Sequence, residues 1–383
     1  YFHAYRIDHV LGLFRIWEMP AHCVTGMLGR FRPAVPLSRE ELDQRGLWDI
    51  NRLCEPYIRP HLLEELFGTE WAQEPGSWRF KPEFNSERAI WNATQGASAA
   101  DVTLWRDVPP LCQKLIKLLQ NVVLLRDLEA DNSFHPNIAL HATSSFLELP
   151  ADAQGALKDL YHNYMYERQN HLWQEHAYKT LPALCGASDM MVFGEDLGMI
   201  PSCLPPVLAD LSVLGLRIQR MAGDEGREFG DPAQYPYMSA CSPSCHDTST
   251  LRGWWEHDSD RRARFFREQL TATPQSGLSQ DEDPPAACLA GVAHAVLKQH
   301  AQSQSAWAIF PIQDLMALDE GLAKRPAHEE QINDPTNPKH YWRFRLHVSL
   351  EDMLAERGWI ECMQDLLLRS GRTTQKDFSN LHL

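Results

Sequence analysis

The sequence lacks two features that would point to common classes of partner. Its 383 residues contain 36 basic against 51 acidic side chains, a formal net charge of −15 at pH 7. A nucleic-acid-binding protein needs a basic surface, so this balance argues against a polyanionic partner. Long hydrophobic runs are missing too: none approaches the roughly 18 residues of a membrane-spanning helix. We therefore expect neither a nucleic-acid nor a membrane partner.

Paired cysteines are also lacking. The nine cysteines are odd in number and scattered, unlike the dense pairs of a secreted disulfide framework. A reducing compartment, the cytoplasm, is the better expectation. Cys241, Cys245 and His246 could be imagined as zinc ligands, but no second Cys/His pair lies at finger-like spacing. The sequence thus favours a protein without a metal, with the zinc site as the weaker alternative.

No initiator methionine and no signal segment opens the chain. The first eight residues, YFHAYRID, alternate and are rich in β-formers, as if the chain began inside a strand. We interpret the sequence as an N-terminally truncated fragment. Its first strand would then be a bare parallel edge, so we predict that residues 1–383 alone are unstable or inactive.

The length suggests two domains or one large α/β unit with insertions. Residues 30–110 are polar and punctuated by proline, which favours an irregular insertion whose tryptophans lie in the core rather than on sugar platforms. Apolar spacing predicts helices at 111–125, 156–184, 202–214, 259–271 and 286–301. Strands are predicted at 1–10, 190–193, 216–221, 237–241 and 307–312. Strands that alternate with helices imply a parallel sheet with right-handed crossovers.

Three acidic residues follow predicted strands: Asp8, Glu195 and Asp247. In parallel α/β barrels, the loops at the carboxyl ends of strands build the active site. Arg6, two residues before Asp8, points to the same face and would keep Asp8 ionised, as a nucleophile must be. Glu195 follows an apolar strand and Gly194, and partial burial would suit it to general acid/base work. His246 puts a hydrogen-bonding group beside Asp247.

Each of these patterns also has a purely structural interpretation. The Arg6–Asp8 pair could be a structural ion pair, which is the commoner use of such a spacing. Glu195 and Asp196 could be charges that complement the dipole at a helix N-terminus. Residues 246–248 (HDT) could be a helix N-cap. It is the occurrence of three acids at strand ends in one chain that favours catalysis.

Several blocks, taken in order, resemble glycoside hydrolase family 77, the 4-α-glucanotransferases. Residues 6–9 (RIDH), with Gly12 and 17–20 (WEMP), resemble that family's fourth-strand block, and 194–198 (GEDLG) resembles its fifth-strand block. Residues 245–250 (CHDTST) resemble the seventh-strand block and 307–314 (WAIFPIQD) the eighth. Residues 333–335 (NDP) with 342–345 (WRFR) resemble its closing segment. The wording at 4–9, 216–221 and 332–342 is closest to the cytosolic plant and algal members. The match runs from residue 1 to about 350.

The resemblance implies a fold of class α/β: the C-terminal part of a (β/α)8 TIM barrel, from about strand 4 to strand 8, with a helical and irregular insertion between the first two strands present. It implies four regions along the chain: barrel strand 4 and its loop at 1–20, the insertion at 21–188, strands 5 to 8 with their helices at 189–350, and a C-terminal helix and tail at 351–383.

The resemblance also implies roles for the site residues. Asp8 matches the nucleophile, Glu195 the acid/base and Asp247 the transition-state stabiliser. The matching substrate-binding positions are Arg6, His246, Asp224 and Asn333. The sequence around the last two is less similar to that of the family. The implied activity is retaining transfer between α-1,4-glucans such as maltose, malto-oligosaccharides or heteroglycan, with no cofactor and with the two acting carboxyl groups about 5–5.5 Å apart. The alternatives are an α-glucan hydrolase of the amylase type and a non-catalytic glucan-binding barrel.

Overall fold

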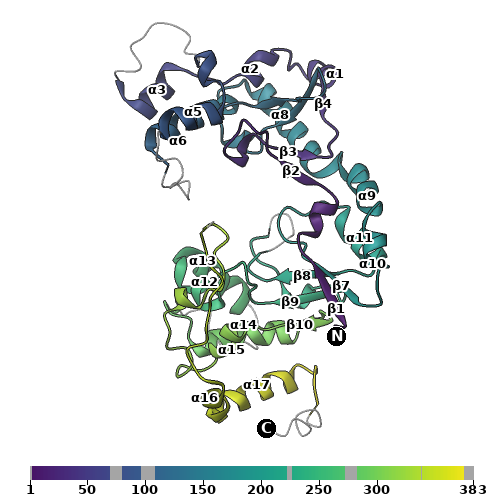
Figure 1. The fold of residues 1–383 in the computed structure, drawn as a ribbon, viewed down its shortest axis with the longest axis vertical. Coiled ribbons are helices and arrows are strands. Elements are labelled where there is room, and N and C mark those ends of the chain that lie inside the picture. Colours follow the sequence, from purple (N-terminus) through teal and green to yellow (C-terminus); the bar gives the residue numbers. More distant parts are fainter. Residues whose placement is uncertain are drawn as a thin grey trace. The chain divides into compact units, whose positions relative to one another are not determined.

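The computed structural model describes residues 2–69, 80–95, 108–221, 227–271, 283–337 and 339–374, which fall into two compact units (Figure 1). The first, called here the sheet unit, comprises Tyr1–Val10, Ala183–Ile200 and Leu208–Leu383. The second, the insertion unit, comprises Leu11–Pro182 and Pro201–Val207. The predicted region limits at 20/21 and 188/189 stay predictions.

The sheet unit is built on five parallel strands in the order β1-β7-β8-β9-β10 (Figure 1). They are β1 Ala4–Ile7, β7 Met191–Gly194, β8 Leu214–Ile218, β9 Ser239–Ser242 and β10 Trp307–Ala308. The predicted parallel sheet is therefore confirmed. In the chain, Leu11–Pro182 separates β1 from β7. Paired residues near the carboxyl ends, Ile7 with Gly194 and Ile218 with Ser242, bring those ends to one edge of the sheet.

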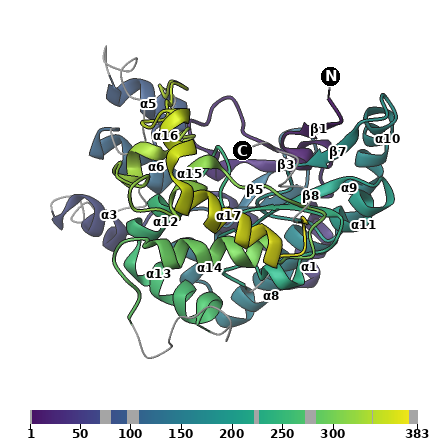
Figure 2. The ribbon, with the colours of Figure 1, turned by 90° about the horizontal axis from the view of Figure 1, so that it is seen from below.

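Helices pack around an apolar core in this unit. They are α12 Leu251–His257, α13 Ser259–Phe265 with a π-helical turn Phe266–Leu270, α14 Ala290–Ala301, α15 Ile312–Met316, α16 Leu350–Ala355 and α17 Arg357–Arg369. Trp255, Phe265 and Trp359 are buried in this core. Figure 2 shows α17 running beside α14, with which it is in contact. Burial of side chains this large is the main stabilising contribution in this unit.

Several predicted limits are wrong in ways that have local causes. The strand predicted at 1–10 covers only Ala4–Ile7, because a 3₁₀ turn begins at Val10. The strand predicted at 307–312 ends at Ala308, since Pro311 is the N-cap of α15. The strand predicted at 216–221 begins and ends earlier, at Leu214–Ile218, and the helix predicted at 202–214 is α11 Leu204–Asp210.

The insertion unit holds two small antiparallel sheets and many short helices. The strands are β2 Ile16–Glu18 and β3 Arg30–Arg32 in one sheet, and β4 Leu37–Ser38, β6 Ser133–Pro136 and β5 Leu124–Arg126 in the other. The helices are α1 Arg39–Gln44, α2 Ile50–Cys54, α3 Pro60–Phe67, α5 Glu87–Gln95, α6 Pro110–Leu119, α7 Ser144–Leu147, α8 Ala151–His162, α9 Asn170–Tyr178 and α10 Leu181–Cys185, the last at the border with the sheet unit.

The expectation of an irregular segment at 30–110 is therefore wrong for its described part, which contains four helices and two strands. The helix predicted at 111–125 stops at Leu119, where β5 soon follows. The long helix predicted at 156–184 corresponds to α8, the π-helical turn Asn163–Glu167, α9 and α10. Of the tryptophans predicted to lie in the core, Trp48 is 71% exposed, whereas Trp71, Trp78 and Trp105 lie outside the described residues.

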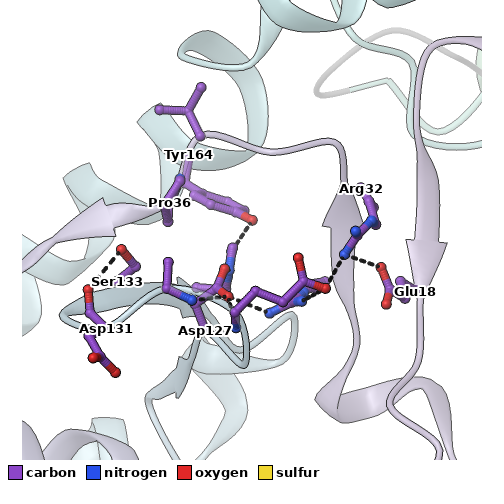
Figure 3. Close-up of polar contacts among 12 residues, drawn as sticks. Glu18, Arg32, Pro36, Asp127, Asp131, Ser133 and Tyr164 are labelled. Atoms are coloured by element: carbon purple, nitrogen blue, oxygen red, sulfur yellow. Dashed lines mark hydrogen bonds and ion pairs between the residues drawn. The ribbon is translucent and has the colours of Figure 1, made fainter.

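A buried polar network joins the strands of the insertion unit to the π-helical turn (Figure 3). His135 on β6 is 2% exposed, with Nδ1 2.7 Å from the Tyr164 hydroxyl and Nε2 2.7 Å from Asp127 Oδ2. Arg30 on β3 pairs with Asp127 at 3.2 Å. Because each buried polar group here has a partner, the network fixes the relative positions of β3, β6 and the turn.

Candidate active site

The first element of the site is the Arg6–Asp8 pair at the end of β1. Arg6 Nη2 lies 2.9 Å from Asp8 Oδ1, so the two side chains share a face as the strand period predicts. The side chains are 38% and 75% exposed. An ion pair this open to water contributes little to stability, about 0–1 kcal/mol. A role in stability therefore explains little of this pair, whereas a carboxylate open to a ligand is what a nucleophile requires.

The second element is Glu195, directly after β7. Its carboxylate Oε2 accepts a hydrogen bond of 2.9 Å from the backbone N–H of His9, the residue after Asp8. Its own backbone N–H donates to Ile7 O at 2.9 Å, and its carbonyl accepts from Val10 N at 3.0 Å. Glu195 is thus tied on three sides to the segment that carries Asp8.

Two backbone features allow this close approach. His9 has φ 46°, in the left-handed region that few non-glycine residues adopt, and this turn follows Asp8 at once. At Gly194 an added Cβ would lie 3.2 Å from side-chain atoms of Val10 and of Val213. The lack of a side chain at Gly194 thus permits close packing. Backbone strain next to a site residue is a frequent mark of function.

The third element is Asp247, in the loop after β9. Its Oδ1 accepts a hydrogen bond of 2.7 Å from Asn333 Nδ2, and its Oδ2 lies 3.2 Å from His246 Nε2. The Asp247 side chain is 47% exposed, whereas Asn333 is only 8% exposed. A buried amide thus holds one oxygen of a carboxylate that stays open to ligands.

The structure excludes two of the structural interpretations. The N-cap of α12 is Thr250, whose hydroxyl accepts from Gly253 N at 3.1 Å, and not a residue of 246–248. Among the described residues, the first helix to follow Glu195 is α11, which begins at Leu204, so Glu195 and Asp196 do not flank a helix N-terminus. Asp196 binds Arg217 on β8 instead, at 2.7 Å.

Strands β1 and β7, which precede Asp8 and Glu195, are neighbours, and β9, which precedes Asp247, belongs to the same sheet. Figure 1 shows these strands. Two carboxyl groups at neighbouring strand ends can divide the work of a proton donor and a nucleophile. A third carboxylate suits a centre on which positive charge develops.

The comparison with known families agrees with this chemistry. The family model described as 4-alpha-glucanotransferase, glycoside hydrolase family 77, matches residues 1–351. The chain belongs to this family.

Relatives of this glycoside hydrolase family 77 chain are longer proteins. It is 46% identical over 383 residues to the 4-alpha-glucanotransferase DPE2 of Oryza sativa subsp. japonica, a match of 97% of this chain and 39% of the rice protein. It is 34% identical over 176 residues to the 4-alpha-glucanotransferase of Chlamydia trachomatis serovar D, covering 45% of this chain and 31% of the relative. The chain thus spans about two-fifths or less of the relatives it matches.

Two solved structures also match. The amylomaltase from Streptococcus agalactiae in complex with acarbose is 18% identical with a TM-score of 0.38, covering 52% of this chain and 35% of that one. The amylomaltase from Corynebacterium glutamicum is 13% identical with a TM-score of 0.35, covering 88% and 57%.

The sequence analysis did not predict two contacts at the candidate active site. Asp196, which follows Glu195, is 1% exposed and accepts hydrogen bonds from Leu216 N at 2.6 Å and from Arg217. These bonds hold the chain next to Glu195 against β8. Trp342, 57% exposed, lies with its ring centroid 5.7 Å from that of His246. The motif GEDLG at 194–198 could have indicated that Asp196 has a structural role. Nothing local could have paired Trp342 with His246, which lies far away in the sequence.

Other predicted features fall elsewhere. Asp224 lies outside the described residues. All nine cysteines are unpaired, and Cys241 Sγ is buried 3.2 Å from the Ser303 hydroxyl. A search of the described residues finds no group of three or more His, Cys, Asp or Glu that could hold a metal ion. The helices of the described ranges include none with the length and hydrophobicity of a membrane span.

Two cavities of about 460 and 470 Å³ lie within the insertion unit. Asp49, Arg52 and Tyr57 help to line the first, and Lys117, Asn121 and Asn137 the second. Neither includes a predicted site residue. The candidate active site is therefore a group of side chains at strand ends and not one of these two cavities.

Proposed function

We propose that this chain carries the catalytic residues of a retaining 4-α-glucanotransferase. The observation that supports this most is the set of hydrogen bonds from Glu195 to the segment around Asp8, which keeps the two carboxyl groups on neighbouring strands. Glu195 protonates the glycosidic oxygen as the bond to the anomeric carbon breaks. Asp8 forms the new bond to that carbon and gives a covalent glucosyl enzyme.

The second half of the reaction reverses these roles. The carboxylate of Glu195 takes the proton from the 4-hydroxyl group of an acceptor sugar, whose oxygen attacks the anomeric carbon and releases Asp8. Asp247 hydrogen-bonds the sugar more strongly as positive charge develops. Arg6, His246, Asp224 and Asn333 contact substrate or hold the acids. The mechanism needs no cofactor, because the carboxylates perform every step.

The finer description follows the same proposal. Strands β1, β7, β8, β9 and β10 correspond to strands four to eight of a (β/α)8 barrel, whose catalytic residues come from strand ends. The substrates are α-1,4-glucans: maltose, malto-oligosaccharides or heteroglycan. The location is cytoplasmic, to which unpaired cysteines are suited.

Product analysis tests the activity. The natural full-length protein, incubated with maltotriose, is expected to release glucose and longer chains while the number of reducing ends stays constant. A rise in reducing ends would identify a hydrolase instead, and unchanged maltotriose would contradict both enzymes.

A trapping experiment tests the nucleophile. An α-glucosyl fluoride needs no acid to lose fluoride, so Glu195→Gln is expected to form the glucosyl enzyme but not to pass the sugar on. Mass spectrometry of the digested protein should find a glucosyl group on the peptide containing Asp8. Asp8→Asn is the matched control and should carry none. A label on any other peptide would overturn the assignment.

A further inference from the structure

Arg220 is a buried cation that the mechanism above does not use. It follows β8, the strand that lies between β7 and β9, and it is only 4% exposed. Burial lowers the pKa of its guanidinium to about 10, opposed by the nearby charge of Asp314. A buried charge is costly unless it is well bonded, so its partners define what Arg220 does.

These partners lie on both sides of Asp247. Nε donates to Pro243 O at 3.1 Å and Nη2 donates to the Ser244 hydroxyl at 3.0 Å, before His246 and Asp247. After them, Nη2 donates to Ser249 O at 2.9 Å and Nη1 to Thr250 O at 3.4 Å. One rigid planar group thus binds the two ends of the loop that presents Asp247, called here the 243–250 loop.

Asp314 completes this arrangement from α15. The Ser244 hydroxyl accepts from Arg220 and donates to Asp314 Oδ2 at 2.6 Å, so it joins the two buried charges. Asp314 Oδ1 accepts from Leu251 N, the first residue of α12, at 2.7 Å. Asp314 itself is fully buried. The 243–250 loop is therefore fixed at its base by Arg220, Ser244 and Asp314 and near its tip by Asn333.

We propose that Arg220 is a positioning residue, which holds the 243–250 loop so that the Asp247 carboxylate meets the charge developing on the sugar. The proposal rests on the function proposed above and extends it. The guanidinium reaches Pro243 O, Ser249 O and Thr250 O through three separate nitrogens. Lysine keeps the charge, but its three donors share one nitrogen, which cannot take the place of this planar fork. The role therefore requires the geometry of the guanidinium and not its charge alone.

Kinetics of three variants of the natural full-length protein test the proposal. Arg220→Lys is expected to lower kcat about 10- to 100-fold, as a displacement near 1 Å can, with KM changed by less than about threefold. Ser244→Ala removes only the bridging hydroxyl and gives a smaller loss in the same direction, which keeps the test open should the lysine variant fold poorly. Arg372→Met is the matched control, because Arg372 also binds several carbonyls of one loop, those of Ala301, Ser303 and Ser305.

Amide hydrogen exchange gives a readout that does not depend on activity. Arg220→Lys should speed exchange across the 243–250 loop, whereas Arg372→Met should do so only near residues 301–306. Equal kcat losses in Arg220→Lys and Arg372→Met, or unchanged kcat in Arg220→Lys and Ser244→Ala, would overturn the proposal. If the unmodified protein transfers no glucose, the proposed function fails. Amide hydrogen exchange still tests the role of Arg220 in that case. Unaltered exchange of the 243–250 loop in Arg220→Lys overturns the proposal, and faster exchange supports the conclusion that Arg220 holds this loop.

Discussion

The backbone N–H of His9 donates to the carboxylate of Glu195 at 2.9 Å, and His9 is the residue that follows Asp8. This contact links the predicted acid to the predicted nucleophile through a single residue in the left-handed backbone region. Any change in the backbone at His9 therefore affects both groups at once. The two residues are thus coupled in position, although their proposed chemical roles, acid for Glu195 and nucleophile for Asp8, differ.

Leaving-group dependence should separate the two acids. Glu195→Gln is expected to lower kcat on maltotriose about 10²- to 10⁴-fold, because the leaving oxygen then lacks its acid. Release of fluoride from an α-glucosyl fluoride needs no acid, so the first turnover should be much less affected. Asp8→Asn should lose both reactions. Equal effects of Glu195→Gln on the two substrates would contradict its role as the acid.

Asn333 should matter through Asp247. Asn333→Ala removes the 2.7 Å hydrogen bond to Asp247 Oδ1, and kcat is expected to fall about tenfold or more. Asn333→Asp places a second carboxylate against the first and should be worse than alanine. Steady-state kinetics of both variants check this order. Activity higher in Asn333→Asp than in Asn333→Ala would show that the amide does not act on Asp247 as an electrostatic partner.

A side chain at Gly215 on β8 should lower the stability of the fold. A Cβ there would lie 2.5 Å from Asp196 Oδ2 and 2.8 Å from an Arg217 nitrogen. Gly215→Ala is expected to lower the free energy of unfolding by about 1–3 kcal/mol. Gly155→Ala inside α8 is the control, because nothing lies within 4 Å of its Cβ position, and it should stabilise by about 0.5–1 kcal/mol. Urea unfolding of both variants measures the difference, and equal midpoints would contradict the prediction.

His300 should make stability fall in acid. Burial lowers the pKa of His300 from 6.5 to about 4, so the unfolded chain binds its proton first as the pH falls. The free energy of unfolding should therefore decrease from about pH 6.5 toward pH 4, by at most about 1.4 kcal/mol per pH unit from this group. His300→Gln should remove that part of the slope. His171→Gln changes a side chain that is 84% exposed and serves as the control; an unaltered slope in His300→Gln would contradict the argument.

Much of the sheet unit could be predicted, because its signals are local. The apolar run before Gly194 is β7, and the alternation of strands and helices correctly predicts a parallel sheet. The end of β10 was harder to place, since Pro311 caps a helix that the run of apolar residues hides. Strand-end acids could be found in the same way, whereas their roles came from the family resemblance.

The insertion unit was less predictable, because its elements are short. Helix α1 has one buried residue, Leu42, and so shows no apolar period. Its N-cap Ser38, with Glu41 three residues later, is a capping pattern that could have revealed it. The contacts of Arg220 with the 243–250 loop and of Asn333 with Asp247 join residues far apart in the chain. No periodicity reports such contacts, so only coordinates reveal them.

The unpaired thiols have a practical consequence. Burial raises the pKa of Cys23 and Cys203 to about 11, and also raises that of Cys288 in the sheet unit. At neutral pH these sulfur atoms should react with an alkylating reagent only when the surrounding structure opens. Rates of labelling at Cys23, in the insertion unit, and at Cys288 would therefore time the opening of each unit separately, and would reveal which of the two unfolds first on warming.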